Sequence, residues 1–127
     1  MIDWIRVREL RDEIGAEDFA EVVLMFLQEA DDVVARMRNS VVPGGVIPGG
    51  GADLHFLRGA ALNLGFRAIA NLCHEGECRA KEGLPVDLGA IIDRFTTVRA
   101  AFIAGLESGL DEAADAAAAQ RESLTED

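Results

Sequence analysis

The sequence predicts an all-α protein, an antiparallel four-helix bundle with a short extra N-terminal helix. Two observations predict this fold. Apolar residues recur in steps of three and four over most of the chain, whereas the alternation typical of a β-strand is found nowhere. Short connections separate the periodic stretches, and amphipathic helices joined in this way bury their apolar faces against one another. We expect the bundle to occupy residues 1–110 and an acidic, alanine-rich tail to occupy residues 111–127.

The first two helices are predicted at residues 3–14 and 17–39. Asp3 can cap the first helix, and Gly15 can end it. The second helix has acidic residues in its first turn and arginines near its end, as the helix dipole prefers. Its apolar residues form one broad stripe: Phe19, Val22, Val23, Phe26, Leu27, Ala30, Val33, Val34 and Met37.

A glycine- and proline-rich segment at residues 43–51 is the clearest break, and we expect it to connect antiparallel helices. It is not a phosphate-binding P-loop, because no Gly-Lys-Ser/Thr sequence follows it. Further helices are predicted at 52–64 and 66–82, each ended by a glycine. A fifth helix starts after Pro85 and carries an apolar stripe as far as Leu106, and the alanine-rich start of the tail could prolong it.

Charge and length exclude several classes of function. The 127 residues include 12 Lys and Arg against 23 Asp and Glu, a net charge of −11. This balance argues against nucleic acid, whose phosphates need cations, and against an anionic membrane surface. No apolar run approaches the roughly 18 residues that span a bilayer, and no secretory signal opens the chain. The length also excludes a kinase with its own nucleotide-binding fold.

The basic residues and cysteines indicate where the protein works. All the basic residues but one are arginine, which favours a GC-rich bacterial genome. The two cysteines do not make a disulfide framework, which fits a reducing compartment. We therefore expect a cytoplasmic protein.

His55, Arg58 and Gly59 share one face of the helix predicted at 52–64. At about 100° per residue they cluster with Leu62, away from the buried stripe. Each has a structural explanation, since a histidine or arginine can be solvated and a glycine can admit a neighbouring helix. A glycine inside a helix nevertheless costs about 1 kcal/mol relative to alanine. Together the three place an imidazole beside a cation that can neutralise an anion and beside space for a second macromolecule.

His74 and Glu77 lie three residues apart on the next helix and share a face. If the two helices are adjacent, the Glu77 carboxylate can hold one N–H of His55. That contact would fix the tautomer and make the other ring nitrogen a better nucleophile. An ordinary i,i+4 ion pair between Glu77 and Lys81 explains the carboxylate equally well. Spacing alone leaves both interpretations open.

The run HFLRGAALNLG at residues 55–65 resembles the motif of histidine-containing phosphotransfer (HPt) domains. That motif is His, any residue, an aliphatic residue, Lys or Arg, then Gly, with a second Gly six residues later. The resemblance covers about residues 5–110 and implies a four-helix bundle acting in a two-component phosphorelay. It implies that His55 accepts the phosphoryl group at Nε2. Arg58 would replace the usual lysine, and Gly59 would leave room for a receiver domain.

The resemblance extends to the phosphotransfer domains of chemotaxis histidine kinases, which carry a second His and a Glu on the next helix. His74 and Glu77 stand at the same separations from His55, 19 and 22 residues. The resemblance thus implies that Glu77 orients the acceptor and that His74 is its network partner. The implied partners are response-regulator receiver domains and a sensor or hybrid histidine kinase. Leu62 and Phe56 are candidate docking residues, although Phe56 would equally fit the core. No cofactor is expected, since the receiver would supply Mg²⁺.

A metal-binding helical bundle is the alternative function. His74 and Cys78 are i,i+4 and could chelate one ion, with Glu77 and His55 completing the set. A third interpretation is an interaction module that keeps the fold and has lost transfer. Gly76 departs from what the resemblance implies, and it could either allow a close helix crossing or soften the site.

Overall fold

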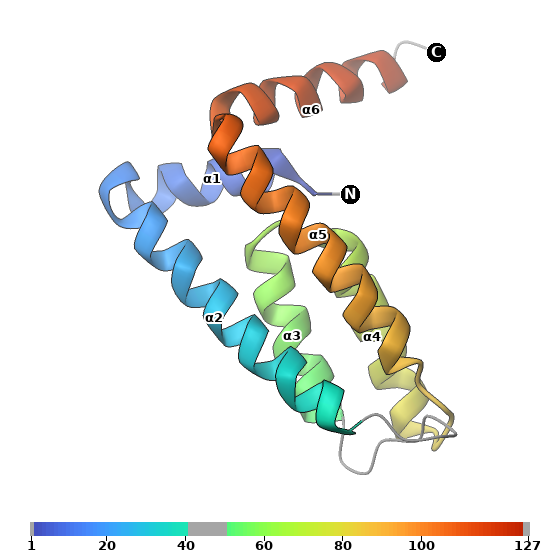
Figure 1. The fold of residues 1–127 in the computed structure, drawn as a ribbon. Coiled ribbons are helices and arrows are strands. Elements are labelled where there is room, and N and C mark those ends of the chain that lie inside the picture. The colour runs from blue at the N-terminus through green and yellow to red at the C-terminus, as the bar shows by residue number, and fades with distance from the viewer. Residues whose placement is uncertain (1, 41–50, 126–127) are drawn as a thin grey trace.

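The computed structural model describes residues 2–40 and 51–125, and its regular elements there are all helices (Figure 1). They are α1 (Trp4–Ile14), α2 (Ala16–Ser40), α3 (Gly51–Asn63), α4 (Arg67–Lys81), α5 (Leu88–Ser108) and α6 (Leu110–Thr125). The prediction of an all-α protein is confirmed. The connector predicted at 43–51 lies, apart from Gly51, outside the described residues. None of the described helices is both long and apolar enough to cross a lipid bilayer.

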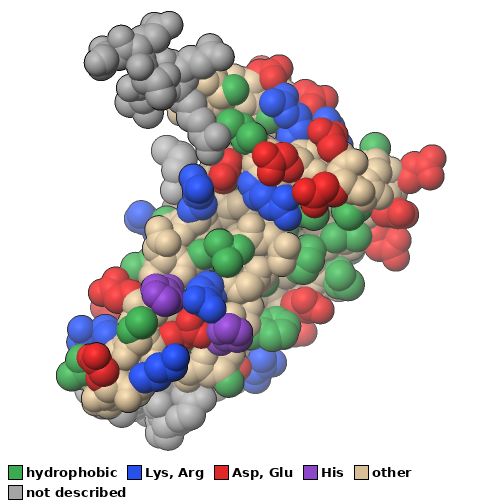
Figure 2. All heavy atoms as spheres, turned by 180° about the vertical axis from the view of Figure 1, so that it is seen from behind, with side chains coloured by type: hydrophobic (Ala, Val, Ile, Leu, Met, Phe, Trp, Pro, Cys, Tyr) green, Lys and Arg blue, Asp and Glu red, His purple; other side chains and the backbone are tan. Residues whose placement is uncertain are grey.

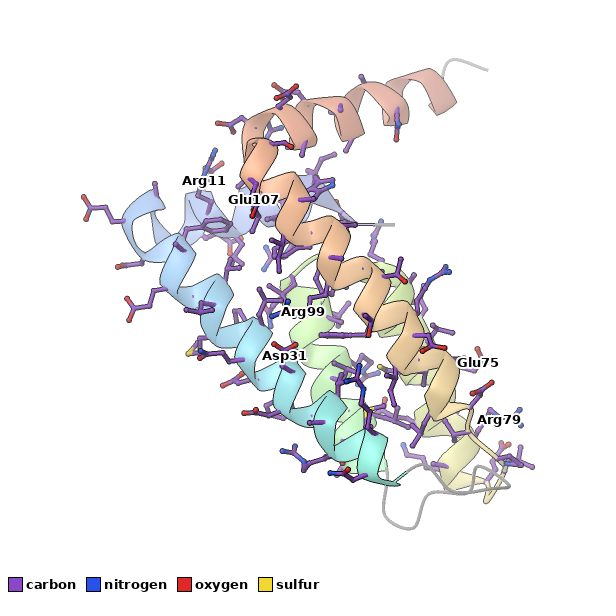
Figure 3. The ribbon with its side chains drawn as sticks, in the orientation of Figure 1. Arg11, Asp31, Glu75, Arg79, Arg99 and Glu107 are labelled. Carbon is purple, nitrogen blue, oxygen red and sulfur yellow. The ribbon has the colours of Figure 1, made fainter. Side chains whose placement is uncertain are left out.

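Four helices, α2 to α5, enclose the core. The backbone of α3 runs close to those of α2 and α4, and the backbone of α5 runs close to these same two helices, whereas in the described chain the backbones of α3 and α5 lie farther apart. The largest fully buried side chains of the core are Phe102, Met37, Leu54, Leu57, Leu64, Ile69, Val7, Val33 and Cys73. Arg99 of α5 also donates two hydrogen bonds to the Asp31 carboxylate of α2, each 2.9 Å long (Figure 3). Such a two-pronged pair fixes orientation as well as distance.

Gly65 makes the sharp turn that leads from α3 into α4. Its φ of 77° is a left-handed conformation that other residues rarely adopt. A Cβ at this position would lie 2.6 Å from the Asp3 carbonyl oxygen. The Asp3 amide donates to the Gly65 carbonyl at 2.7 Å, so the start of the chain is attached to this turn. Only a glycine fits here, and α3 and α4 therefore lie side by side.

The alanine-rich segment forms a helix of its own. The sequence had also allowed it to prolong α5, and the structure shows that it does not. Gly109, with φ 120°, separates the two helices, and α6 turns back to pack against α1 (Figure 1). Ala114 is fully buried in this contact. Because the alanines are small, the two helix backbones can approach closely.

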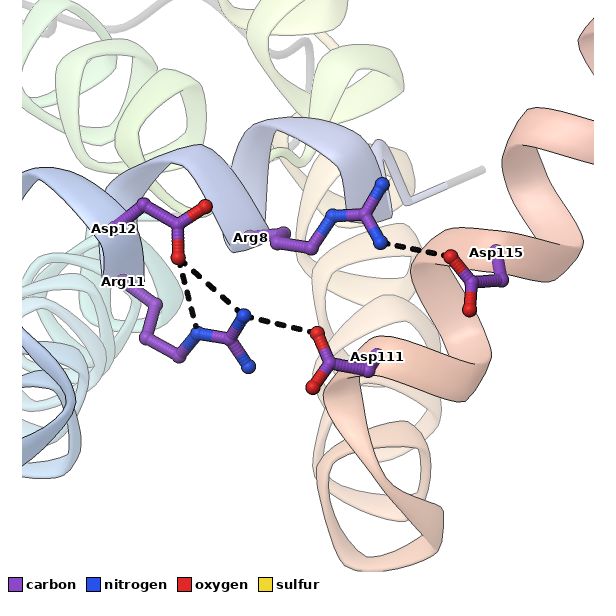
Figure 4. A network of polar contacts seen from close by, with 5 residues as sticks. All are labelled: Arg8, Arg11, Asp12, Asp111 and Asp115. Carbon is purple, nitrogen blue, oxygen red and sulfur yellow. Dashed lines mark hydrogen bonds and ion pairs between the residues drawn. The ribbon is translucent and has the colours of Figure 1, made fainter.

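Ion pairs attach α6 to α1. Arg8 donates to Asp115 at 2.8 Å and Arg11 donates to Asp111 at 2.9 Å (Figure 4). The hydrogen bond from Arg11 holds the pKa of Asp111 below its usual value, although burial opposes this. A carboxylate with a lowered pKa stabilises the folded state above its unfolded pKa, and that contribution is lost as the pH falls through the folded value. The attachment is therefore present at neutral pH and weakens in acid.

Trp4 packs α1 across the end of the helix bundle. Its ring stacks on Phe102 with the centroids 5.5 Å apart. A Cβ at Gly105 would collide with the Trp4 ring. The glycine thus leaves the space that the indole occupies, and α1 closes this end of the core.

Candidate functional site

The site is built between α3 and α4, which approach each other closely at Gly76. A Cβ at Gly76 would lie 3.1 Å from the Leu54 side chain and 3.2 Å from that of Val86. Both distances are tighter than ordinary van der Waals contact, so the missing side chain is what admits Leu54. Of the two roles that the sequence left open for Gly76, the structure supports the close helix crossing. The crossing brings the next residue, Glu77, against α3.

Glu77 faces His55 across this crossing. Its Oε1 lies 2.9 Å from His55 Nδ1, and its Oε2 lies 3.5 Å from the Arg58 guanidinium. The Glu77 side chain is only 11% exposed, whereas that of His55 is 68% exposed. A buried carboxylate needs such partners, because without them its desolvation is costly. The alternative pair with Lys81 is not formed in the described structure.

Arg58 lies between the two histidines. Its Nη1 is 3.0 Å from His74 Nδ1, and its Nη2 is 3.2 Å from His55 Nδ1. A guanidinium can only donate hydrogen bonds, so His74 Nδ1 must accept and its proton must sit on Nε2. That Nε2 faces the Cys78 sulfur at 3.9 Å. The four predicted site residues, His55, Arg58, His74 and Glu77, are therefore one cluster.

His55 Nδ1 cannot bond to both of its neighbours at once. A bond to the Glu77 carboxylate needs a proton on Nδ1, and a bond from Arg58 needs that nitrogen to be unprotonated. With the proton on Nδ1, the buried carboxylate accepts a hydrogen bond at Oε1 and has the Arg58 cation beside Oε2, and Arg58 keeps its contact with His74. The opposite tautomer leaves Oε1 without a donor. The first arrangement is therefore favoured, and it leaves Nε2 with a free lone pair on an exposed ring.

Gly59 is exposed, and a Cβ there would have no atom within 4 Å beyond its local helical surroundings. Nothing in the described chain therefore requires a glycine at this position. Phe56 and Leu62 on the same helix are 47% and 53% exposed. Phe56 is thus a surface residue and not part of the core. Figure 2 shows both histidines on one face of the molecule, with hydrophobic side chains beside them.

Replacing Gly59 by alanine is expected to stabilise the protein by about 0.5–1 kcal/mol, because alanine favours the helix and meets no neighbour. The same change at Gly76 is the matched control and should bring no such gain, since its Cβ crowds Leu54 and Val86. Denaturant unfolding of both variants measures the difference. A loss of stability at Gly59 would show that the glycine serves a contact within the chain.

The metal-binding alternative is not supported. Among the residues that the structure describes, no group of three or more His, Cys, Asp and Glu side chains could hold a metal ion. The Arg58 guanidinium already lies between the His55–Glu77 pair and His74, where an ion would have to sit.

Sequence reasoning missed where the Arg58 guanidinium lies. The sequence suggested that Arg58 neutralises an anion beside the acceptor, whereas the structure places it on the Nδ1 side of His55, bound to Glu77 and His74. The three-residue spacing of His55 and Arg58 was the available signal. It could not reveal that the side chain points toward α4, because that depends on the register of the two helices.

Comparison with known families gives one match. A family model described as Hpt domain matches residues 21–120, which include all of α3 and α4. No curated protein and no solved structure gives a significant match.

Proposed function

Because the chain belongs to the Hpt domain family, whose members act in phosphotransfer of two-component signalling, we propose that His55 accepts a phosphoryl group at Nε2 and passes it on. The observation that carries the proposal is the exposed imidazole whose Nδ1 lies 2.9 Å from the buried Glu77 carboxylate. That contact supports a tautomer with a nucleophilic Nε2. We also propose that helices α2 to α5 form an antiparallel four-helix bundle.

The proposed reaction is a reversible exchange between His55 and an aspartyl phosphate of a receiver domain. The Nε2 lone pair forms the N–P bond, while the O–P bond of the aspartyl phosphate breaks and its electrons return to the receiver carboxylate. The imidazole then carries a positive charge, which Glu77 stabilises through the Nδ1 proton. Mg²⁺ would be held by the receiver, and no residue of this chain has to bind it.

Arg58 and His74 have supporting roles in this mechanism. Arg58 neutralises part of the charge on Glu77 and is held by His74 Nδ1, at 3.0 Å. The network thereby keeps the carboxylate in place while His55 reacts. Gly59, Phe56 and Leu62 supply the open, partly apolar surface against which the receiver would dock. A histidine kinase is the proposed source of phosphoryl groups, in a bacterial cytoplasm.

Transfer from a receiver domain tests the proposal. Receiver domains phosphorylated by a small-molecule acyl phosphate would be mixed with the protein, and the label on the protein would be followed. We expect an acid-labile, base-stable label, as for phosphohistidine, that a second receiver removes. A label stable to acid, or none from any receiver, would contradict the proposal. The second outcome would favour the interaction module that has lost transfer.

A further inference from the structure

The face around His55 continues onto α2. Resting on the proposed function, we propose that the receiver docks across α3 and the adjoining side of α2, with Met25, Glu29 and Asp32 as specificity-determining residues. These three residues would select a receiver that carries basic side chains where it meets α2. The proposal thus names the chemistry of the partner surface, which phosphotransfer itself leaves open.

An ion pair shows which side of α2 lies along α3. Arg36 of α2 donates to Asp53 of α3 at 3.3 Å, so the end of α2 lies beside the start of α3. At about 100° per residue, Met25, Glu29 and Asp32 lie within about 40° of Arg36 around the helix. They therefore form one stripe that follows α3 along its length.

The levels of this stripe match the acceptor face. Both helices rise about 1.5 Å per residue. Counting from the Arg36–Asp53 pair, Asp32 lies level with Leu57, the neighbour of Phe56, and Glu29 lies level with Ala60, the neighbour of Gly59. The opposite side of α2 faces α5 instead, where Asp31 accepts from Arg99. A receiver centred on His55 and Gly59 would thus meet the Met25 side of α2.

The stripe has unused binding capacity. Met25 is 47% exposed, as is Phe56, which is unusual for large apolar side chains. Glu29 and Asp32 are exposed, and neither makes an ion pair or side-chain hydrogen bond in the part of the chain that the structure describes. The apolar side chains offer burial, and the two carboxylates offer charge.

The opposite border of the face is basic. Arg58 lies on the α4 side of α3, and the exposed Lys81 lies about 20° from His74 around α4. The face is therefore acidic along α2 and apolar along α3, and it carries the exposed cation Lys81 on α4. Charges ordered in this way steer the encounter and fix the orientation of a partner whose charges run in the opposite order. Continuity with the acceptor face, where the proposed transfer takes place, is the reason for assigning the surface to a receiver.

Met25 and Leu24 are a matched pair for the apolar part of the surface. Both are exposed, at 47% and 54%, but Leu24 lies about 20° from Asp31, on the α5 side of α2. With the receiver that transfers fastest to the wild type, Met25→Ala is expected to lower kcat/KM about 3- to 10-fold, within the cost of truncating an interface residue. Leu24→Ala should leave it within about two-fold. Equal effects of the two changes would contradict the placement.

Charge reversal tests the acidic border. The double variant Glu29→Lys, Asp32→Lys is expected to raise KM at least about 10-fold at low salt, leave kcat unchanged and reduce the salt dependence. The control double variant Asp93→Lys, Glu107→Lys changes the net charge equally at two exposed positions of α5, outside the proposed docking surface, and should behave as wild type. If both double variants slow transfer alike, the net charge of the protein controls the rate and this surface does not.

Two further outcomes are decisive. Absence of transfer to the wild type would contradict the proposed function together with this inference. Normal transfer that is indifferent to Glu29→Lys, Asp32→Lys would contradict this inference alone. Sedimentation of the wild type tests whether a second copy of the chain covers this surface. Self-association that Glu29→Lys, Asp32→Lys abolishes would assign the surface to that second copy and contradict the inference.

Discussion

Replacing His55 by glutamine is expected to abolish the phosphoryl label, a loss of roughly 10³-fold or more, because no other group of the cluster combines exposure with an oriented, free nitrogen. Arg58 blocks Nδ1 of His74, and that nitrogen therefore has no lone pair for attack. The fold should be retained, since the His55 side chain is 68% exposed and glutamine keeps an N–H that can donate to Glu77. Labelling with the phosphorylated receiver and thermal unfolding are the two measurements.

His74→Gln is the matched control for this prediction. It removes the other histidine of the same cluster, and the glutamine carbonyl can still accept from Arg58. We expect this variant to keep its label, with a rate lowered by less than about 10-fold, because His74 acts on the acceptor only through Arg58. A label that persists in His55→Gln, or that disappears only in His74→Gln, would move the acceptor to the other histidine.

Replacing Glu77 by alanine is expected to slow transfer about 10- to 100-fold without abolishing it, as is typical when a group that orients a reactive imidazole is removed. Without the carboxylate, Arg58 is the remaining partner close to Nδ1, and it favours the tautomer that places the proton on Nε2. The cation formed on phosphorylation also loses its counter-charge. Glu77→Gln keeps an acceptor and should fall between alanine and the wild type.

Glu75→Ala is the control for Glu77, because Glu75 is an exposed carboxylate on the outer side of the same helix (Figure 3). Transfer by Glu77→Ala should be about 10- to 100-fold slower than transfer by Glu75→Ala. Nitrogen NMR of the His55 ring supplies a second readout that a merely structural role would not move. We expect the proton to leave Nδ1 in Glu77→Ala only. Unchanged rates and an unchanged tautomer would assign Glu77 to stability alone.

Much of the fold could be predicted from local patterns. Asp3 and Asp87 cap α1 and α5, and each side chain accepts from the backbone amide three residues later. The apolar steps of three and four placed the helices to within a few residues, because side chains that recur at the helical period share one buried face. Whether the alanine-rich segment prolongs α5 could not be predicted, since a glycine such as Gly109 can either end a helix or be tolerated inside it.

The sequence by itself determined the helices and the composition of the acceptor face: His55, Arg58 and Gly59 lie together because their spacing and the helical period are local properties. Only the tertiary structure decided which residues meet across helices. Leu54 occupies the space at Gly76 and so fixes the register of α3 and α4. In this register Glu77 pairs with His55 and not with Lys81. The same register turns Arg58 toward His74. Contacts between helices depend on how side chains interlock at close range, which no one-dimensional pattern encodes.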